Sequence, residues 1–161
     1  MKTIFEFSEN TNTQGWYVVN DVVMGGLSKS NLSVNKSGNG VFEGKISLKN
    51  NGGFASVQYA FEAIKPKNHS SFVLYLKGDG KTYKFRAKRC SSDKHSYNYT
   101  FDTSGDWQEV HIEFKNMIAQ FRGAKLPMTN YNGDVLEQIG ILFGNEKQED
   151  FKLEINKVVI I

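Results

Sequence analysis

Cysteine, proline and long apolar segments are scarce in this chain of 161 residues, and each shortage argues against a class of protein. Cys90 is the only cysteine, so no intrachain disulfide can form, and a single thiol fits a reducing compartment better than secretion. No segment approaches the roughly 20 apolar residues of a membrane-spanning helix. Met1 leads into residues 4–7 without an apolar signal core or a cleavage site. We therefore expect a cytoplasmic protein without a membrane span.

Motifs of the common enzyme classes are also missing. The chain has no Gly-x-Ser-x-Gly motif, no phosphate-binding loop and no Gly-x-Gly-x-x-Gly run that opens a helix. Its histidines, His69, His95 and His111, have no cysteine or carboxylate at metal-ligand spacing. Glu109 and Glu113 lie on the same side of an expected strand, about 13 Å apart by strand rise, which is too far for a glycosidase pair. We expect no catalytic residues, no metal site and no cofactor.

Alternation of apolar and polar residues is the dominant pattern present, and it is typical of β-strands. The expected strands cover residues 5–7, 16–19, 42–48, 57–61, 72–77, 82–88, 97–101, 107–114, 117–121, 139–143 and 151–161. Fifteen glycines against two prolines suit many tight turns, and no long amphipathic helix, internal repeat or linker is found. These patterns predict a single all-β domain over residues 1–161, built as an antiparallel β-sandwich.

Two turn sequences predict hairpins. Asp79-Gly80 is a preferred pair for a two-residue type I′ turn, so we expect it to join residues 72–77 to residues 82–88 in one sheet. Residues 102–106 are expected to join the strands on either side of them in the same way. At the C-terminus, Phe151, Leu153, Ile155, Val159 and Ile161 share one parity, which predicts one apolar face to the end of the chain.

Residues 16–30 form the most distinctive stretch of the sequence. Trp16 begins a short run of aromatic and β-branched residues, which favours a strand. Asn20 and Asp21 interrupt it, because their side chains bond to nearby backbone in turns. Three apolar residues and then Gly25-Gly26 follow, and paired glycines allow a very close approach of other backbone or of a ligand. We expect this loop to pack against the domain.

This stretch and four further motifs carry a resemblance to a known family. The other motifs are Asn50-Asn51-Gly52-Gly53-Phe54-Ala55-Ser56, Gly78-Asp79-Gly80 followed by Tyr83, Trp107, and Phe121-Arg122-Gly123. Their order and their spread over most of the chain resemble the complex I intermediate-associated protein family. That is the thirty-kilodalton mitochondrial assembly-factor family, which has many bacterial relatives, and this chain is similar to a bacterial single-domain member.

The resemblance implies a jelly roll of the galactose-binding-like kind. It also implies a non-enzymatic, chaperone-like module that binds a protein partner during assembly of a larger complex, respiratory complex I being the family's known case. On this basis we expect a partner- or ligand-binding surface around residues 16–30. Its candidate residues are Trp16, Asn20, Asp21, Met24, Gly25, Gly26, Ser28, Gly53, Phe54, Asp79 and Arg122.

Two of these candidates leave more than one interpretation open. Asp21 could shape a loop that faces a ligand, or it could cap a turn while the glycines satisfy backbone geometry, and the second role is the more common one. Arg122 is one of only three arginines against seventeen lysines. A planar bidentate donor of this kind suits a carboxylate, so we expect Arg122 to pair with Asp21 or Asp79 and to tie two loops together.

Lys84, Arg86 and Lys88 lie on one face of an expected strand. With Tyr97 and Tyr99 on the next strand, such a face could bind single-stranded nucleic acid or an acidic protein. Charged side chains on a solvent-facing strand also simply keep a sheet soluble and unpaired. Because the net charge is only +3 and no nucleic-acid motif accompanies the patch, we favour the second role and expect no nucleic-acid partner.

Carbohydrate binding is the alternative function, by analogy with other jelly-roll domains. It requires exposed aromatic rings on which sugars can stack. The candidate rings are Tyr17, Tyr75, Tyr97, Tyr99 and Tyr131. A structural calcium ion held by loop carbonyls and a carboxylate is also known in relatives of this fold, but the sequence does not predict one.

Overall fold

The computed structural model describes residues 1–21 and 25–161, and nearly all of its regular structure is β-strand. The strands are β1 (Lys2–Glu6), β2 (Trp16–Asn20), β3 (Lys29–Val34), β4 (Gly40–Lys45), β5 (Ala55–Ile64), β6 (Ser71–Lys77), β7 (Thr82–Lys88), β8 (Ser96–Asp102), β9 (Trp107–Glu113), β10 (Ile118–Phe121), β11 (Ala124–Lys125), β12 (Leu136–Phe143) and β13 (Asp150–Ile160). Short 3-10 helices connect some of them, among which are η1 (Thr13–Gly15), η3 (Lys49–Asn51) and η4 (Phe114–Asn116).

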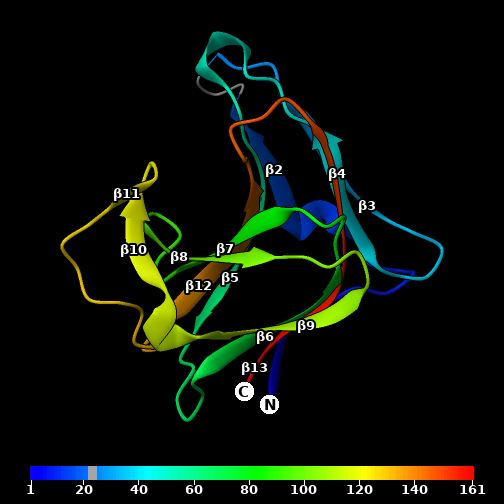
Figure 1. The fold of residues 1–161 in the computed structure, drawn as a ribbon. Coiled ribbons are helices and arrows are strands. Elements are labelled where there is room, and N and C mark those ends of the chain that lie inside the picture. The colour runs from blue at the N-terminus through cyan, green and yellow to red at the C-terminus, as the bar shows by residue number, and fades with distance from the viewer. Residues whose placement is uncertain (22–24) are drawn as a thin grey trace.

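The strands form two antiparallel sheets that face each other as a jelly-roll sandwich (Figure 1). The six-stranded sheet has the order β3-β4-β13-β6-β9, and β1 also pairs with β13. The seven-stranded sheet has the order β11-β10-β8-β7-β12-β5-β2. The all-β class and the sandwich architecture are therefore confirmed.

The hydrophobic core lies between the two sheets, where alternate residues of each strand point inward. In β7, Tyr83, Phe85 and Ala87 are buried and alternate with half-buried polar residues. Phe85 meets Phe72 of the opposite sheet edge-to-face, with ring centroids 4.9 Å apart. A contact of this kind stabilises the sandwich beyond the apolar area that it buries.

Both expected hairpins are wrong, because each turn joins strands of different sheets. β6 pairs with β13 and β9, whereas β7 pairs with β8 and β12, so the chain crosses from one sheet to the other at Asp79-Gly80. β8 and β9 are separated in the same way. Gly80 does adopt a positive φ of 83°, and its N–H donates to Oγ1 of Thr103 in the second crossover at 3.0 Å. The conformation of the turn is thus set by its own residues, whereas the pairing of the strands depends on which apolar faces meet across the core.

The C-terminal strand departs from a single parity. A bulge between Ile155 and Lys157 of β13 shifts the register against β6, so that Val158 and Ile160 point into the core. Ile161, which the alternation assigns to the apolar face, is 43% exposed. A bulge adds one residue to a strand and reverses the faces that follow it.

The chain's described residues include no helix that has the length and apolar character needed to span a bilayer.

Candidate functional site

A row of polar side chains crosses the outer face of the seven-stranded sheet near its centre. The register places Gln58 of β5 beside Gly140 of β12, Gly140 beside Arg86 of β7, and Arg86 beside Asn98 of β8. Their neighbours along the strands are buried in the core, namely Val57, Phe85, Tyr97, Ile139 and Ile141. Because successive side chains of a strand point to opposite faces, this row faces away from the core.

Gly140 leaves a hollow in the middle of this row. A Cβ atom there would lie 2.9 Å from the carbonyl oxygen of Val57 and 3.4 Å from Cγ of Gln58, so the position has no room for a side chain without a shift of its neighbours. Long side chains stand on both sides of it, from Gln58 and from Arg86. Because Gly140 has no side chain and lies between two long side chains, this face of the sheet contains a groove of about 430 Å³.

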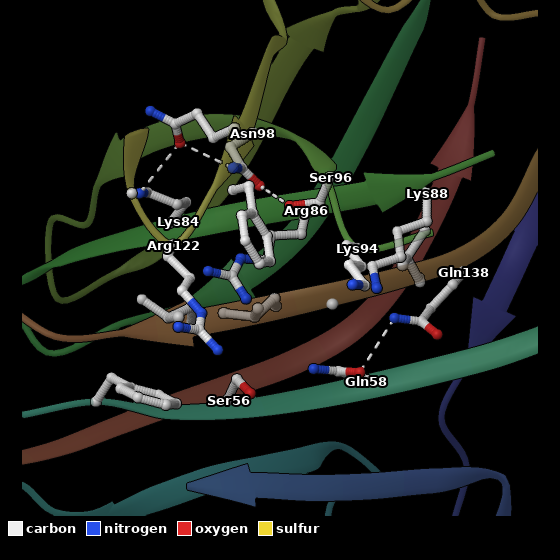
Figure 2. A pocket seen from close by; sticks show the side chains of 18 residues that line it. Ser56, Gln58, Lys84, Arg86, Lys88, Lys94, Ser96, Asn98, Arg122 and Gln138 are labelled. Carbon is white, nitrogen blue, oxygen red and sulfur yellow. Dashed lines mark hydrogen bonds between the residues drawn. The ribbon is translucent and has the colours of Figure 1, made fainter. Parts of the chain in front are cut away.

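The groove is walled by the β10–β11 hairpin. Arg122 and Gly123 form its two-residue turn, with positive φ angles of 50° and 80°. The Arg122 guanidinium lies over the ring of Phe121, with Cζ 5.3 Å from the ring centroid. Figure 2 shows Arg122 and Arg86 directed into the same hollow, one from the hairpin and one from the sheet. The hairpin thus turns a sheet face into a groove with a basic rim.

Eighteen residues line the groove, and they include five cations but no carboxylate. The lining residues are Phe54, Ser56, Gln58, Lys84, Arg86, Lys88, Lys94, Ser96, Asn98, Gln120, Phe121, Arg122, Gly123, Gln138, Ile139, Gly140, Ile141 and Leu142. None of the five cations forms an ion pair with a described carboxylate, although four lysine–carboxylate or arginine–carboxylate pairs occur elsewhere among the described residues. The groove is therefore electropositive without internal compensation.

Burial lowers the pKa values of three of these cations, Lys84, Arg86 and Lys88. Desolvation lowers the pKa of the Arg86 guanidinium from its ordinary value. Desolvation and, secondly, the charge of Arg86 lower the pKa of Lys84. The same two causes lower the pKa of Lys88, against an opposing effect of Asp93. In addition, Nε of Arg86 is buried and has no hydrogen-bond partner among the described residues. The site therefore holds positive charge at a cost to the folded protein.

Side-chain amides form two hydrogen-bond networks along the groove. On the β5 side, Tyr17 Oη donates to Oε1 of Gln138 at 3.1 Å, and Nε2 of Gln138 donates to Oε1 of Gln58 at 3.1 Å. On the β10 side, Nδ2 of Asn98 donates to Oε1 of Gln120 at 2.8 Å (Figure 2). Amides carry both donors and acceptors, so the networks are able to receive either kind of group from a ligand.

The lining residues offer no side chain with an obvious catalytic role. The groove has no histidine, cysteine, tyrosine or carboxylate among its lining residues, and its serines are Ser56 and Ser96. Across the described residues, no three histidine, cysteine or acidic side chains cluster in a way that could hold a metal ion. The arrangement is suited to recognition by hydrogen bonds and positive charge.

Asp21, the centre of the sequence-based site, is fully buried and joins two loops, the one between β2 and β3 and the one between β4 and β5. Its Oδ1 accepts from the Ser28 amide at 3.0 Å, and its Oδ2 accepts from the Ser28 hydroxyl at 2.5 Å. Oδ2 also accepts from the amides of Gly53 at 2.5 Å and Phe54 at 3.3 Å. Burial raises the pKa of this carboxyl, but the four hydrogen bonds together lower the pKa by a larger amount, so the net shift is downward.

The glycines near Asp21 follow from this arrangement. A Cβ on Gly26 or on Gly52 would overlap the Asp21 carboxylate, so only glycine fits at either position. Trp16 is buried in the core, and the Asn20 side chain accepts from the Ser30 hydroxyl at 2.5 Å. The geometry supports the turn-capping interpretation of Asp21. Whether this loop also contacts a partner stays a prediction.

The remaining candidates are scattered. Asp79 accepts from the Lys152 amide at 2.8 Å and from the Tyr83 hydroxyl at 3.0 Å, which ties the crossover turn to the sheets. The expected ion pair of Arg122 with Asp21 or Asp79 is wrong, because Arg122 takes part in none of the ion pairs among the described residues. Met24 lies outside the described residues. Gly25 has a positive φ of 85° and open space around its Cα.

Of the sequence-based candidates that the structure describes, Phe54 and Arg122 alone line the groove. Sequence reasoning considered Lys84, Arg86 and Lys88 but assigned them to a solvated face. The sequence pattern that could have indicated the groove was the alternation of basic and buried residues along β7. This pattern alone does not distinguish a solvated face from a groove, because the wall of the groove is formed by the β10–β11 hairpin.

The expected tyrosine neighbours of the basic face are wrong. Tyr97 is buried in the core and Tyr99 packs against it, because this parity of β8 points inward. Tyr131, which was a candidate ring for sugar stacking, is also buried in the core. Tyr17 is different. It pairs with Gln58 in the register of β2 and β5, is 45% exposed, and lies at the edge of the groove face.

Comparisons with known proteins place the fold. A family 11 carbohydrate-binding module from Clostridium thermocellum, solved in complex with a β-1,3-1,4-mixed-linked tetrasaccharide, superposes with a TM-score of 0.73 at 14% identity over 99% of this chain and 94% of that one. The carbohydrate-binding module CBM29-2 superposes with a TM-score of 0.57 at 10% identity over 99% and 89%. An exo-β-agarase gives a TM-score of 0.60 at 7% identity, and 25% of its chain is covered.

These similarities confirm a β-sandwich of the galactose-binding-like kind and, at such low identity, establish the fold alone. No curated protein matches the chain. The model of one family, described as Complex I intermediate-associated protein 30 (CIA30), matches residues 5–155. The chain therefore belongs to the Complex I intermediate-associated protein 30 family.

Proposed function

We propose that this protein is a non-enzymatic binding module that holds a saccharide chain in the groove of its seven-stranded sheet. The observation that carries the proposal is the line of amide side chains, from Gln138 and Gln58 to Asn98 and Gln120, beside a floor lowered by Gly140. Sugar hydroxyls both donate and accept hydrogen bonds, and so do amides. A groove with a few convergent polar groups is the usual form of a ligand site.

The strand pairing favours a saccharide over an extended peptide. Peptides that bind to sheets commonly add a strand to a free edge, where the backbone N–H and C=O groups are unpaired. The floor of the groove is made by β5, β12 and β7, and each of these strands is paired on both sides. The edge strands of this sheet are β2 and β11. A ligand in the groove is therefore recognised by side chains, as saccharides are.

Aromatic rings flank the polar face. Phe121 is 38% exposed on the hairpin wall, Phe54 lines the groove, and Tyr17 lies at the edge of the same face. Aromatic rings present an apolar surface on which the C–H face of a sugar ring packs. The similarity in fold to a module solved with a bound tetrasaccharide supports the proposal at the level of architecture.

Titration calorimetry against a panel of neutral and charged oligosaccharides tests the proposal. We expect binding to at least one oligosaccharide, and about a tenfold loss in affinity for Gln58→Ala and for Gln138→Ala, since each substitution removes hydrogen bonds made to the ligand. Gln148→Ala is the matched control, because this exposed glutamine is outside the groove. If the folded wild-type protein binds no oligosaccharide of the panel, the proposal is wrong.

A protein contact at the loops around Asp21 is the second candidate, and the family description favours it. Leu27 and Leu48 are 51% and 43% exposed there. They lie on adjoining segments, because Ser28 and Ser47 are joined by two hydrogen bonds, of 3.0 and 3.3 Å. Exposed apolar side chains in proximity are typical of a protein interface.

This second candidate predicts that Leu27→Asp together with Leu48→Asp abolishes capture of one specific protein by the tagged wild-type chain, as measured by quantitative mass spectrometry. Met128→Asp is the control, since Met128 is 40% exposed on a different loop. Equal capture by the wild type and the double variant would argue against these loops as the contact.

A further inference from the structure

The arginines of this chain are used in two different ways. Arg89 donates from Nε and from one terminal nitrogen to the Asp134 carboxylate, at 2.9 and 2.6 Å, which is a bidentate ion pair. Arg86 and Arg122 both line the groove, and neither forms an ion pair with a carboxylate among the described residues. A chain that has three arginines against seventeen lysines thus directs two arginines into one hollow. Guanidinium groups are suited to planar anions, because their donors form a fork.

The charge in the groove is concentrated and partly desolvated. Lys84 and Lys88 flank Arg86 on the same strand, and Lys94 lines the groove from the loop between β7 and β8. Like charges that are close together and shielded from water repel each other more strongly than on an open surface. An anion bound among them would relieve this repulsion.

Arg86 carries the most direct indication of a missing partner. Its Nε is buried without a hydrogen-bond partner among the described residues, whereas buried donors in folded proteins are nearly always paired. The neighbouring position on β12 is Gly140, which has no side chain that could pair with the guanidinium. Figure 2 shows that Arg86 points into the groove rather than away from it.

Resting on the proposed function, we propose that the saccharide held in this groove is anionic, and that a carboxylate or sulfate group on it binds between Arg86 and Arg122. Both groups present oxygens in the arrangement that a guanidinium fork accepts. The amides of Gln58, Gln138 and Asn98 then receive the hydroxyls of the same chain. The positive charge of the two arginines then selects anionic saccharides, and the amides form hydrogen bonds with the sugar hydroxyls.

The test compares each anionic saccharide with its neutral counterpart by titration calorimetry. Oligogalacturonate is paired with its methyl ester, and dextran sulfate with dextran, so that the carboxylate and the sulfate are assayed separately. Oligoglutamate tests whether any acidic polymer suffices. The variants are Arg86→Gln and Arg122→Gln, and the second lies on an exposed turn where folding is not in question. The control is Lys67→Gln with Lys147→Gln, two exposed lysines outside the groove.

We expect at least one anionic saccharide to bind about tenfold more tightly than its neutral counterpart, and each arginine variant to lose about tenfold in affinity. The lysine control retains wild-type affinity, because charge screening leaves distant surface charges with little effect at about 0.15 M salt.

Three outcomes would overturn the inference. In the first, a neutral saccharide and its anionic counterpart bind with equal affinity, and the arginine variants keep that affinity. The groove would then still be a saccharide site, but it would have no selectivity for anionic saccharides. Oligoglutamate that binds as tightly as the best anionic saccharide, with the same losses in the variants, assigns the groove to an acidic peptide. Absence of binding to every saccharide, neutral or charged, refutes the proposed function together with the inference.

Discussion

Replacement of Asp21 by alanine should destabilise the protein severely. The Asp21 carboxylate accepts four hydrogen bonds and is fully buried, so its removal leaves the amides of Ser28, Gly53 and Phe54 without a partner. It also leaves the Ser28 hydroxyl with only the Ser47 carbonyl oxygen as an acceptor. A hydrogen bond to a charged group contributes about 1.5–3 kcal/mol, and the bonds to one carboxylate are not additive. We expect a loss of about 4 kcal/mol, against about 5–15 kcal/mol for a whole domain.

Urea unfolding followed by tryptophan fluorescence measures this loss, and Trp16, which is buried in the core, provides a reporter. Asp106→Ala is the control, because that aspartate is exposed in the loop between β8 and β9. We expect the control to change the free energy of unfolding by less than about 0.5 kcal/mol. A loss below about 1 kcal/mol for Asp21→Ala, with an unchanged denaturant slope, would refute the view that this carboxylate holds the loops together.

The same carboxylate predicts a dependence on pH. Its pKa in the folded protein lies below the ordinary value of 3.8, because its hydrogen bonds outweigh the opposing effect of burial. The stability that it contributes is therefore fully present above pH 3.8 and is lost as the pH falls through the lower folded-state pKa. We expect the difference in unfolding free energy between the wild type and Asp21→Asn to shrink on acidification from neutral pH. A difference that grows instead would contradict the sign of the shift.

Two further substitutions test the groove and the six-stranded sheet. Arg86→Met should stabilise the ligand-free protein by about 1 kcal/mol and so raise its thermal midpoint, because the substitution removes a buried donor that has no partner among the described residues and lies among like charges. A lowered thermal midpoint would argue that the guanidinium has another hydrogen-bond partner. Gly44→Ala should destabilise by at least about 2 kcal/mol in urea unfolding, because its Cβ would overlap the carbonyl oxygen of Lys29 on β3. Wild-type stability of Gly44→Ala would contradict the close approach of β3 and β4.

The basic strand illustrates what a sequence pattern leaves open. Lys84, Arg86 and Lys88 alternate with buried residues, so their common face was predictable from parity. Their role was not, because a solvent-facing basic strand and a basic groove have the same sequence. The difference lies in Gly140 and in the β10–β11 hairpin, and both reach this face only through non-local strand pairing. Arg122 was a candidate for a different reason and belongs to this groove.

The motif around Asp21 illustrates the opposite case. Residues 16–30, together with four further motifs, resembled the family, and a turn-capping role was one of the two interpretations that the chemistry of Asp21 allowed. The donors that it binds, however, lie up to 33 residues away in sequence, at Phe54. These hydrogen bonds form only when the tertiary structure brings the two loops together, so the partners of Asp21 were not predictable from the sequence.

The sequence by itself determined the all-β class, the parity of most strands and the glycines at tight turns, because period-two alternation and backbone conformation are properties of a few neighbouring residues. The tertiary structure alone decided which sheet each strand joins, as the crossovers at Asp79-Gly80 and at residues 102–106 demonstrate. It also decided where the groove lies. The physical reason is that pairing and burial are set by contacts between distant segments, which compete across the whole chain, whereas a turn or a strand face is set locally.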